Sequence, residues 1–126
     1  MIKVLPYSDN QTLGVEIQNN YGKDEIRFIK AEIDKRILRG TEKVNLLLKI
    51  DKLKFNEYKP EILFEDLRAG FKEYGQIGHI AVVGNTAIEE MLVTLDNLIF
   101  GDPDENLIEK YFDAENIDEA WKFVKE

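Results

Sequence analysis

Side chains that could carry out chemistry are scarce in this chain of 126 residues. It contains no cysteine and one histidine, His79, so thiolate nucleophiles, disulfides, thiolate-ligated metals and multi-histidine metal sites are excluded. Ser8 is the only serine, and it lacks the flanking glycines of a nucleophile elbow, which excludes serine hydrolysis of that type. His79 directly precedes an apolar run, where we favour a structural or surface role over catalysis.

The apolar run at residues 80–83 ends in a glycine and predicts a strand that is covered on both faces of a parallel sheet. Gly84 permits a tight turn, and Thr86 with Glu89 matches the capping box of a following helix. The N–H groups of Gly84, Asn85 and Thr86 would then face an anion at a helix N-terminus. Because the Gly-rich dinucleotide fingerprint and the phosphate loop are both absent, we favour a plain strand–turn–helix junction, with phosphate or carboxylate binding as the open alternative.

The segment at residues 51–59 follows another predicted central strand, at the edge where ligands bind in open α/β sheets. It interleaves charged and apolar side chains: Asp51, Lys52, Leu53, Lys54, Phe55, Tyr58 and Lys59. One interpretation is a lid for an amphipathic anionic ligand, or a contact surface for a membrane or a partner. The other, to which we give slightly more weight, is a loop whose apolar side chains cover the core while its lysines stay in water.

The acidic side chains form no convincing metal or acid–base site. Residues 102–106 imitate the opening of a calcium loop, but Leu107 stands where that loop needs glycine, and Asp113 is too short to be its last ligand. The carboxylate pairs at 65–66 and 89–90 are adjacent in sequence, so they diverge around their helices. We therefore expect no metal and no cofactor.

The charge distribution limits the classes of partner. The formal net charge is −8, and from Gly101 onward nine acidic residues stand against three lysines. A general nucleic-acid binder needs a basic face to release phosphate counterions, so we exclude nucleic acid as a partner. No window approaches the roughly 18 apolar residues of a membrane span, and the apolar start of the chain is too short for a signal peptide. With the absence of cysteine, this predicts a cytoplasmic protein.

Hydrophobic periodicity predicts the element order β-β-α-β-α-β-α-β-α. The predicted strands lie at residues 2–7, 12–18, 44–50, 80–83 and 107–112. The first two are joined by a turn-forming Ser-Asp-Asn, which predicts an antiparallel hairpin at the sheet edge, and the second strand alternates so that one of its faces should be more exposed. Right-handed crossovers then place helices on both faces of a mixed five-stranded sheet, an α/β fold in one domain spanning residues 1–126.

Four helices are predicted, beginning near residues 24, 60, 86 and 117. Gly40 is suited to end the first helix, with Arg36 and Arg39 placed to favour the dipole of its last turn. The first and last helices each have an apolar stripe at helical spacing. These stripes are Ile26, Ile29, Ile33 and Ile37 in the first, and Ile117, Ala120, Trp121 and Val124 in the last.

The order and spacing of these patterns resemble the SpoIIAA-like family of the STAS/SEC14-like domain superfamily. The resemblance is carried by MIKVLP at residues 1–6, VEI at 15–17, LLL at 46–48, DL at 66–67, IAVVG at 80–84 and AW at 120–121. Each pattern alone is unspecific, but their ordered combination spans nearly the whole chain.

The resemblance implies a small mixed α/β sheet, commonly without a known catalytic site. Better-known relatives include sporulation anti-anti-sigma factors, which are switched by phosphorylation of a serine after a central strand. This chain has neither serine nor threonine between Asp51 and Pro60, so we do not expect that switch. SEC14-like relatives bind lipids, but 126 residues leave little room for a large enclosed lipid cavity.

We therefore expect a non-catalytic binding or regulatory domain that takes a small apolar or amphipathic ligand, or a protein partner, at the carboxyl edge of the sheet. The expected contacts are apolar from Leu53, Phe55 and Tyr58, charged from Lys52 and Lys54, and hydrogen-bonding from Asn85 and Thr86. The alternative is a small enzyme that uses carboxylate or lysine chemistry in the same crevice. A homodimer is plausible, because small single-domain proteins often form symmetric dimers.

Overall fold

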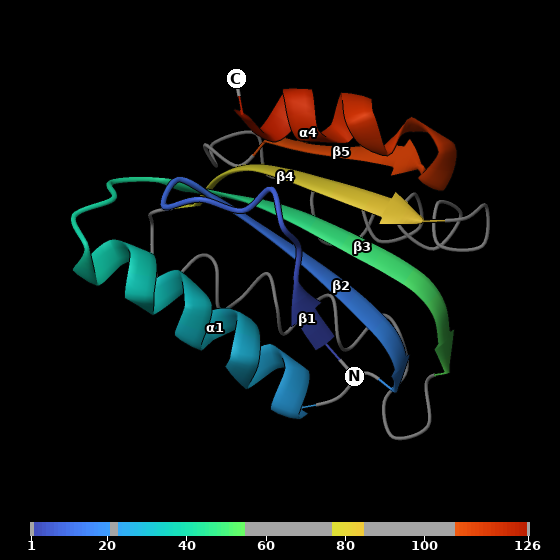
Figure 1. The fold of residues 1–126 in the computed structure, drawn as a ribbon, viewed down its shortest axis with the longest axis horizontal. Helices are drawn as coiled ribbons and strands as arrows, with labels where there is room; N and C mark the ends of the chain where they lie inside the picture. Colours follow the sequence, from blue (N-terminus) through green and yellow to red (C-terminus); the bar gives the residue numbers. More distant parts are fainter. Residues whose placement is uncertain (1, 21–22, 55–76, 85–107, 126) are drawn as a thin grey trace.

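The computed structural model describes residues 2–20, 23–54, 77–84 and 108–125. These residues form a mixed five-stranded sheet with a helix on each face (Figure 1). The strands are β1 (Ile2–Val4), β2 (Thr12–Asn20), β3 (Val44–Lys54), β4 (Ile77–Gly84) and β5 (Ile108–Asp113). The helices are α1 (Lys23–Leu38) and α4 (Ile117–Lys125), and a short 3₁₀ helix (Ala114–Asn116) precedes α4.

The strands follow the order of the chain across the sheet, from β1 to β5. β1 pairs antiparallel with β2, and every later pair is parallel, which confirms the predicted mixed sheet with a hairpin at its edge. β1 is shorter than predicted because Pro6 has no N–H to donate to a neighbouring strand. The chain turns there, with Leu5 donating its N–H to the carbonyl oxygen of Gly14 at 2.8 Å and Ser8 donating to that of Leu5 at 3.1 Å.

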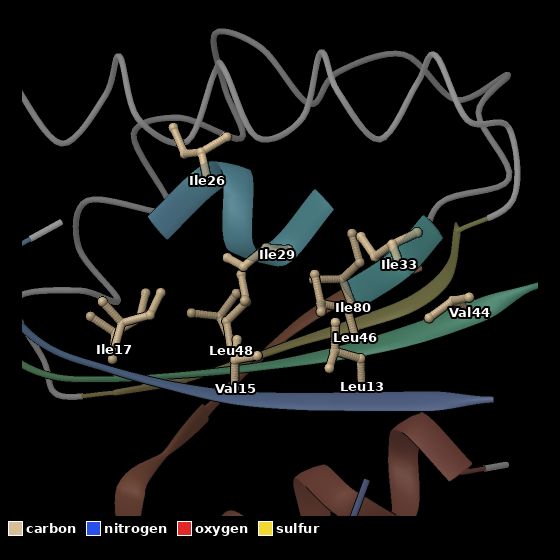
Figure 2. Packing of buried hydrophobic residues seen from close by; sticks show 12 residues of the cluster. Leu13, Val15, Ile17, Ile26, Ile29, Ile33, Val44, Leu46, Leu48 and Ile80 are labelled. Carbon is tan, nitrogen blue, oxygen red and sulfur yellow. The ribbon is translucent and has the colours of Figure 1, made fainter. Parts of the chain in front are cut away.

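α1 covers one face of the sheet with its isoleucine stripe. Ile26, Ile29 and Ile33 are buried (Figure 2). Ile37 packs against the same cluster. Residues three and four apart share one face of a helix, and alternate residues share one face of a strand, so both elements present apolar side chains to each other. The strand members of this cluster are Leu13, Val15, Ile17, Val44, Leu46, Leu48, Ile50, Ile80 and Val82. The stripe predicted for the first helix is confirmed.

α4 covers part of the opposite face (Figure 1). Its predicted stripe packs against the sheet, and Ile117 is the partly buried member of that stripe. The buried apolar cluster on this face consists of Ala120, Trp121 and Val124 of α4 with Leu47, Ala81, Val83 and Phe112 of the sheet. The indole of Trp121 lies directly over Gly14 of β2, where a Cβ would come within 2.9 Å of Cζ2. The absence of a side chain at Gly14 therefore lets α4 approach the sheet closely. For the two helices that the structure describes, the predicted placement on both faces is confirmed.

The C-terminal end of α1 is bound to the turn between β1 and β2. Gly40 adopts a φ of 96°, as predicted for a residue that ends a helix. Arg36 was predicted to favour the helix dipole, and it is also buried, with only 7% of its surface exposed. Its Nε donates to the carbonyl oxygen of Asp9 at 2.9 Å, and its Nη1 donates to the carboxylate of Glu32 at 3.1 Å. Burial alone would raise the pKa of Glu32, but hydrogen bonds from Lys35 and Arg36 outweigh it and lower that pKa.

β4 begins earlier than its apolar run predicted. His79 does not precede the strand but lies inside it, opposite Ile108 of β5. The N–H of His79 donates to Oδ1 of Asn45 at 2.8 Å, and the imidazole lies 5.0 Å from the ring of Phe123 in α4. β4 includes Gly78 and His79, and a prediction from hydrophobic residues alone does not detect such small and polar strand residues. The helices predicted to begin near residues 60 and 86, and the acidic segment at 102–106, lie outside the described residues.

Candidate functional site

The carboxyl ends of β2, β3, β4 and β5 lie along one edge of the sheet, because these strands are parallel. They do not end at the same level. β4 ends at Gly84, one residue after its last pairing with β3, whereas β3 continues to Lys54 alongside β2. The sheet therefore has a two-stranded continuation past the end of β4. We call residues 18–20 and 51–54 the β2–β3 extension.

Four predicted site residues lie in this extension: Asp51, Lys52, Leu53 and Lys54. The prediction that they form a loop is wrong, because residues 18–20 of β2 pair with them. Such pairing depends on the main chain of the neighbouring strand more than on side-chain hydrophobicity, so the charged sequence concealed it. Their role in binding stays a prediction.

A β-bulge interrupts the register within the extension. Gln18 is opposite Asp51, but Asn19 is opposite Leu53, so Lys52 has no partner residue in β2. A bulge bends the strand that carries it, and bulges are frequent beside functional sites, where they redirect a side chain or end the pairing. The irregularity falls within the segment that the sequence marked as a candidate site.

Gly84 is buried at the end of β4 and pairs with Asp113 at the end of β5. The structure brings it to the same edge as the β2–β3 extension, although β3 continues past it. The remaining predicted site residues lie outside the described residues: Phe55, Tyr58, Asn85 and Thr86.

A cluster of charged and polar side chains lies at the start of the extension. The register aligns Lys3 of β1, Glu16 of β2 and Lys49 of β3 on three neighbouring strands. Lys3 Nζ lies 3.4 Å from Oε2 of Glu16, and Lys49 Nζ lies 3.6 Å from Oε1. Nε2 of Gln18 donates to the same Oε1 at 2.8 Å. We call these four residues the Glu16 cluster.

The Glu16 cluster occupies the face of the sheet against which α4 packs. Val15 and Ile17 belong to the apolar cluster under α1, so the intervening Glu16 is on the other face. One face of β2 is the more exposed, as predicted, but the difference is small: Glu16 is 7% exposed and Gln18 is half-buried, whereas the side chains on the α1 face are at most 1% exposed. Glu16 is buried because Trp121 covers the neighbouring part of this face and the polar neighbours of Glu16 surround its carboxylate.

The neighbours of Glu16 keep its carboxylate ionised. Burial alone would raise the pKa of Glu16, but the hydrogen bond from Gln18, the charge of Lys49, and the hydrogen bond and charge of Lys3 together lower it. A carboxylate with a lowered pKa is a weak base, poorly suited to abstract a proton near neutral pH. What it can do is hold two ammonium groups together on one side of the sheet.

Sequence reasoning did not single out the Glu16 cluster. Two charged residues inside predicted strands could have indicated it: Glu16 in the alternating second strand, and Lys49 in the third, which is apolar apart from Asn45 and Lys49. That these two face each other depends on the register between β2 and β3, which no local pattern gives.

The end of β5 carries a local hydrogen bond. The hydroxyl of Tyr111 donates to Oδ1 of Asp113, the last position of the imitated calcium loop, at 3.1 Å. Among the described residues, no group of three or more His, Cys, Asp or Glu side chains is arranged to hold a metal ion. Within the same residues, neither helix is long and apolar enough to cross a membrane.

Comparison with models of known protein families gives one match. A family model described as SpoIIAA-like matches residues 12–125, a span that includes β2 to β5, α1 and α4. The match confirms the resemblance that the ordered core patterns carry. A search of curated proteins and a search of solved structures gave no match.

Proposed function

The chain belongs to the SpoIIAA-like family of STAS domains, and from this we propose that it acts by binding, without catalysing a reaction. Family membership supports a non-catalytic binding and regulatory domain in general terms. The specific form we propose is a domain that takes a small apolar or amphipathic ligand at the carboxyl edge of its sheet. A protein partner at the same edge is the alternative occupant.

The observation that carries this proposal is the β2–β3 extension with its bulge. In open α/β sheets, ligands bind outside the carboxyl ends of the strands, and the extension lies at that edge. The residues that we propose to form the site are Asp51, Lys52, Leu53, Lys54, Phe55, Tyr58, Gly84, Asn85 and Thr86. Within this set, the apolar side chains would contact the apolar body of the ligand, and the lysines would bind its charged group.

One feature favours the alternative of a small enzyme with carboxylate and lysine chemistry. The Glu16 cluster places a carboxylate 3.6 Å from Lys49, just before the extension. We favour binding over catalysis because the lowered pKa of Glu16 does not suit a general base near neutral pH. A cytoplasmic setting and self-association as a homodimer belong to the same proposal; the absence of cysteine supports the first.

Native mass spectrometry of freshly purified protein tests this proposal, because it reports bound small molecules and subunit number together. We expect a bound adduct, or a thermal stabilisation by at least one member of a lipid and metabolite panel. Leu53→Asp should abolish both the bound adduct and the thermal stabilisation. The matched control is Leu38→Asp, at a residue that is 87% exposed at the end of α1, which should leave binding intact.

Circular dichroism of both variants without ligand verifies that they remain folded. Absence of any adduct and of any stabilisation across the panels would contradict the small-ligand proposal. Equal loss of binding in the Leu53 and Leu38 variants would contradict the placement of the site.

A further inference from the structure

We propose that the ligand of this edge is anionic and that Lys3 and Lys49 of the Glu16 cluster bind its oxyanion group. This inference rests on the function proposed above and adds to it the chemical class of the ligand. It also adds two binding residues that were not among the predicted site residues.

The sheet itself brings the two lysines together. Lys3 is opposite Glu16 in the pairing of β1 with β2, and Lys49 is opposite Glu16 in the pairing of β2 with β3. Neighbouring strands lie only about 5 Å apart, so two lysines that flank the middle strand can reach one group above it. At present they converge on the two carboxylate oxygens of Glu16, at 3.4 Å and 3.6 Å.

One carboxylate does not neutralise two ammonium groups. The side chain of Lys3 is 62% exposed and that of Lys49 is 29% exposed, whereas that of Glu16 is 9% exposed. The negative group is thus enclosed while both positive groups still face solvent. An ammonium has three N–H donors, so a lysine paired with one carboxylate oxygen retains donors for a second acceptor. Counted over the side chains that the structure describes, the cluster therefore has one more positive than negative charge, in a chain whose net charge is −8.

The position of the cluster agrees with an amphipathic ligand. Gln18 belongs both to the cluster and to the β2–β3 extension, and Lys49 lies two residues before Asp51. Leu53 is opposite Asn19, which shares the face of Ile17, so the apolar contact lies on the other side of the sheet from the lysines. A ligand whose anionic group meets the lysines therefore reaches Leu53 by passing over the carboxyl edge of the extension. One anionic group at the base of the extension and an apolar body across its end use both features.

The chemistry of lysine sets the range of anions. An ammonium recognises an oxyanion by charge and by rotatable N–H donors, without the planar fork that makes arginine selective for bidentate partners. Carboxylates and phosphate monoesters both meet this requirement. A single surplus charge suits one small anionic group, and the acidic balance of the rest of the chain opposes an extended polyanion.

Titration of the full-length, nitrogen-15-labelled protein with hexyl phosphate, hexanoate and uncharged hexanol tests this inference by NMR. We expect both anions to shift the amide signals of the Glu16 cluster and of the extension. Lys3→Gln and Lys49→Gln should each weaken anion binding about fivefold, the equivalent of about 1 kcal/mol for one solvent-exposed charge contact. Lys49→Arg should retain the binding, because it keeps the charge.

Glu16→Gln distinguishes a binding role from a structural one. It removes the carboxylate that competes with the ligand, so anion binding should become about fivefold tighter on the same scale. The matched control is Lys35→Gln, because Lys35 is also paired with a glutamate, Glu32, at 3.0 Å, but on α1. This control should leave anion binding unchanged. Weaker binding in Glu16→Gln, or equal weakening in the Lys35 and Lys49 variants, would overturn the inference.

The probes separate failure of this inference from failure of the proposed function. If hexanol binds the extension as tightly as hexyl phosphate, and Lys49→Gln changes neither affinity, the ligand is not anionic but the proposed function stands. If no probe shifts the signals of the extension and native mass spectrometry finds no adduct, both proposals fail. Inorganic phosphate distinguishes the source of the anion: tighter binding of hexyl phosphate supports an amphipathic ligand, and equal binding overturns that part of the inference.

Discussion

Gly14 and Trp121 show how one missing side chain sets the distance between a helix and a sheet. A methyl group at Gly14 would come within 2.9 Å of Trp121 Cζ2, and closer still to Cη2. Trp121 is buried, so it cannot move aside without shifting α4. We expect Gly14→Ala to lower the free energy of unfolding by about 1–3 kcal/mol, the usual cost of overpacking a core. Urea unfolding followed by circular dichroism measures this.

The double variant with Trp121→Leu is the control for this prediction. A smaller side chain at residue 121 removes the clash, so Gly14→Ala should cost less in that background than in the native protein. An equal cost in both backgrounds would show that the effect of Gly14→Ala arises from the strand and not from its contact with the indole.

Glu16 and Glu32 should make the free energy of unfolding depend on pH. The pKa of each is lower in the folded protein than the ordinary value of 4.5. Their stabilising contribution is therefore complete above the unfolded pKa and is lost as the pH falls through the lower folded pKa. We expect the free energy of unfolding to drop between about pH 5 and about pH 3, and to drop less in Glu16→Gln/Glu32→Gln. Urea unfolding at several pH values measures this, and parallel curves for the two proteins would contradict it.

At the scale of elements, α1 depends on one buried side chain for its attachment to the β1–β2 turn. Arg36 donates from Nε to the carbonyl oxygen of Asp9, and from Nη1 both to the Glu32 carboxylate and to the carbonyl oxygen of Glu32, the last at 3.0 Å. Arg36→Met would leave these acceptors without their donor. We expect the free energy of unfolding to fall by about 3 kcal/mol, as for other broken buried ion pairs.

Arg39→Met is the matched control on the same helix end. Arg39 is exposed and its Nη1 donates to Oδ1 of Asn10 at 3.3 Å, so its loss should cost less than about 1 kcal/mol. The loss of stability in Arg36→Lys should lie between those in Arg36→Met and Arg39→Met. An ammonium keeps the charge but lacks the guanidinium geometry that serves several acceptors at once. Equal destabilisation by the Arg36 and Arg39 variants would show that only the charge at the helix end matters.

The elements differ in how far the sequence could predict them. The stripe of α1, the glycine that ends it and the edge hairpin depend on residues close in sequence, and they were predicted correctly. The burial of Arg36 and Glu16 depends on partners that are distant in the chain, and local patterns missed both. Residues 51–54 of the candidate site were described as part of a loop, but pairing with β2 extends β3 through these charged residues.

At the scale of the whole molecule, the turn between β1 and β2 connects the two faces of the sheet. α1 contacts it through Arg36, which donates to the carbonyl oxygen of Asp9. α4 contacts the same residue from the opposite face through Lys125, whose Nζ lies 3.7 Å from Oδ2 of Asp9. Oδ1 of Asp9 accepts the N–H groups of Gln11 at 2.9 Å and Thr12 at 2.8 Å, which fixes the shape of the turn. A change in this turn should therefore affect helices on both faces.

Asp9→Ala should loosen the C-terminal ends of both helices at once. It removes the acceptor of two main-chain N–H groups and the contact with Lys125, so we expect a loss of about 2 kcal/mol. Hydrogen exchange followed by mass spectrometry should show faster exchange in the last turns of α1 and α4. Lys125→Met removes only a largely exposed ion pair, so it should cost less than about 1 kcal/mol and affect α4 alone. If Asp9→Ala accelerates exchange in only one helix, the two faces are independent and the turn does not couple them.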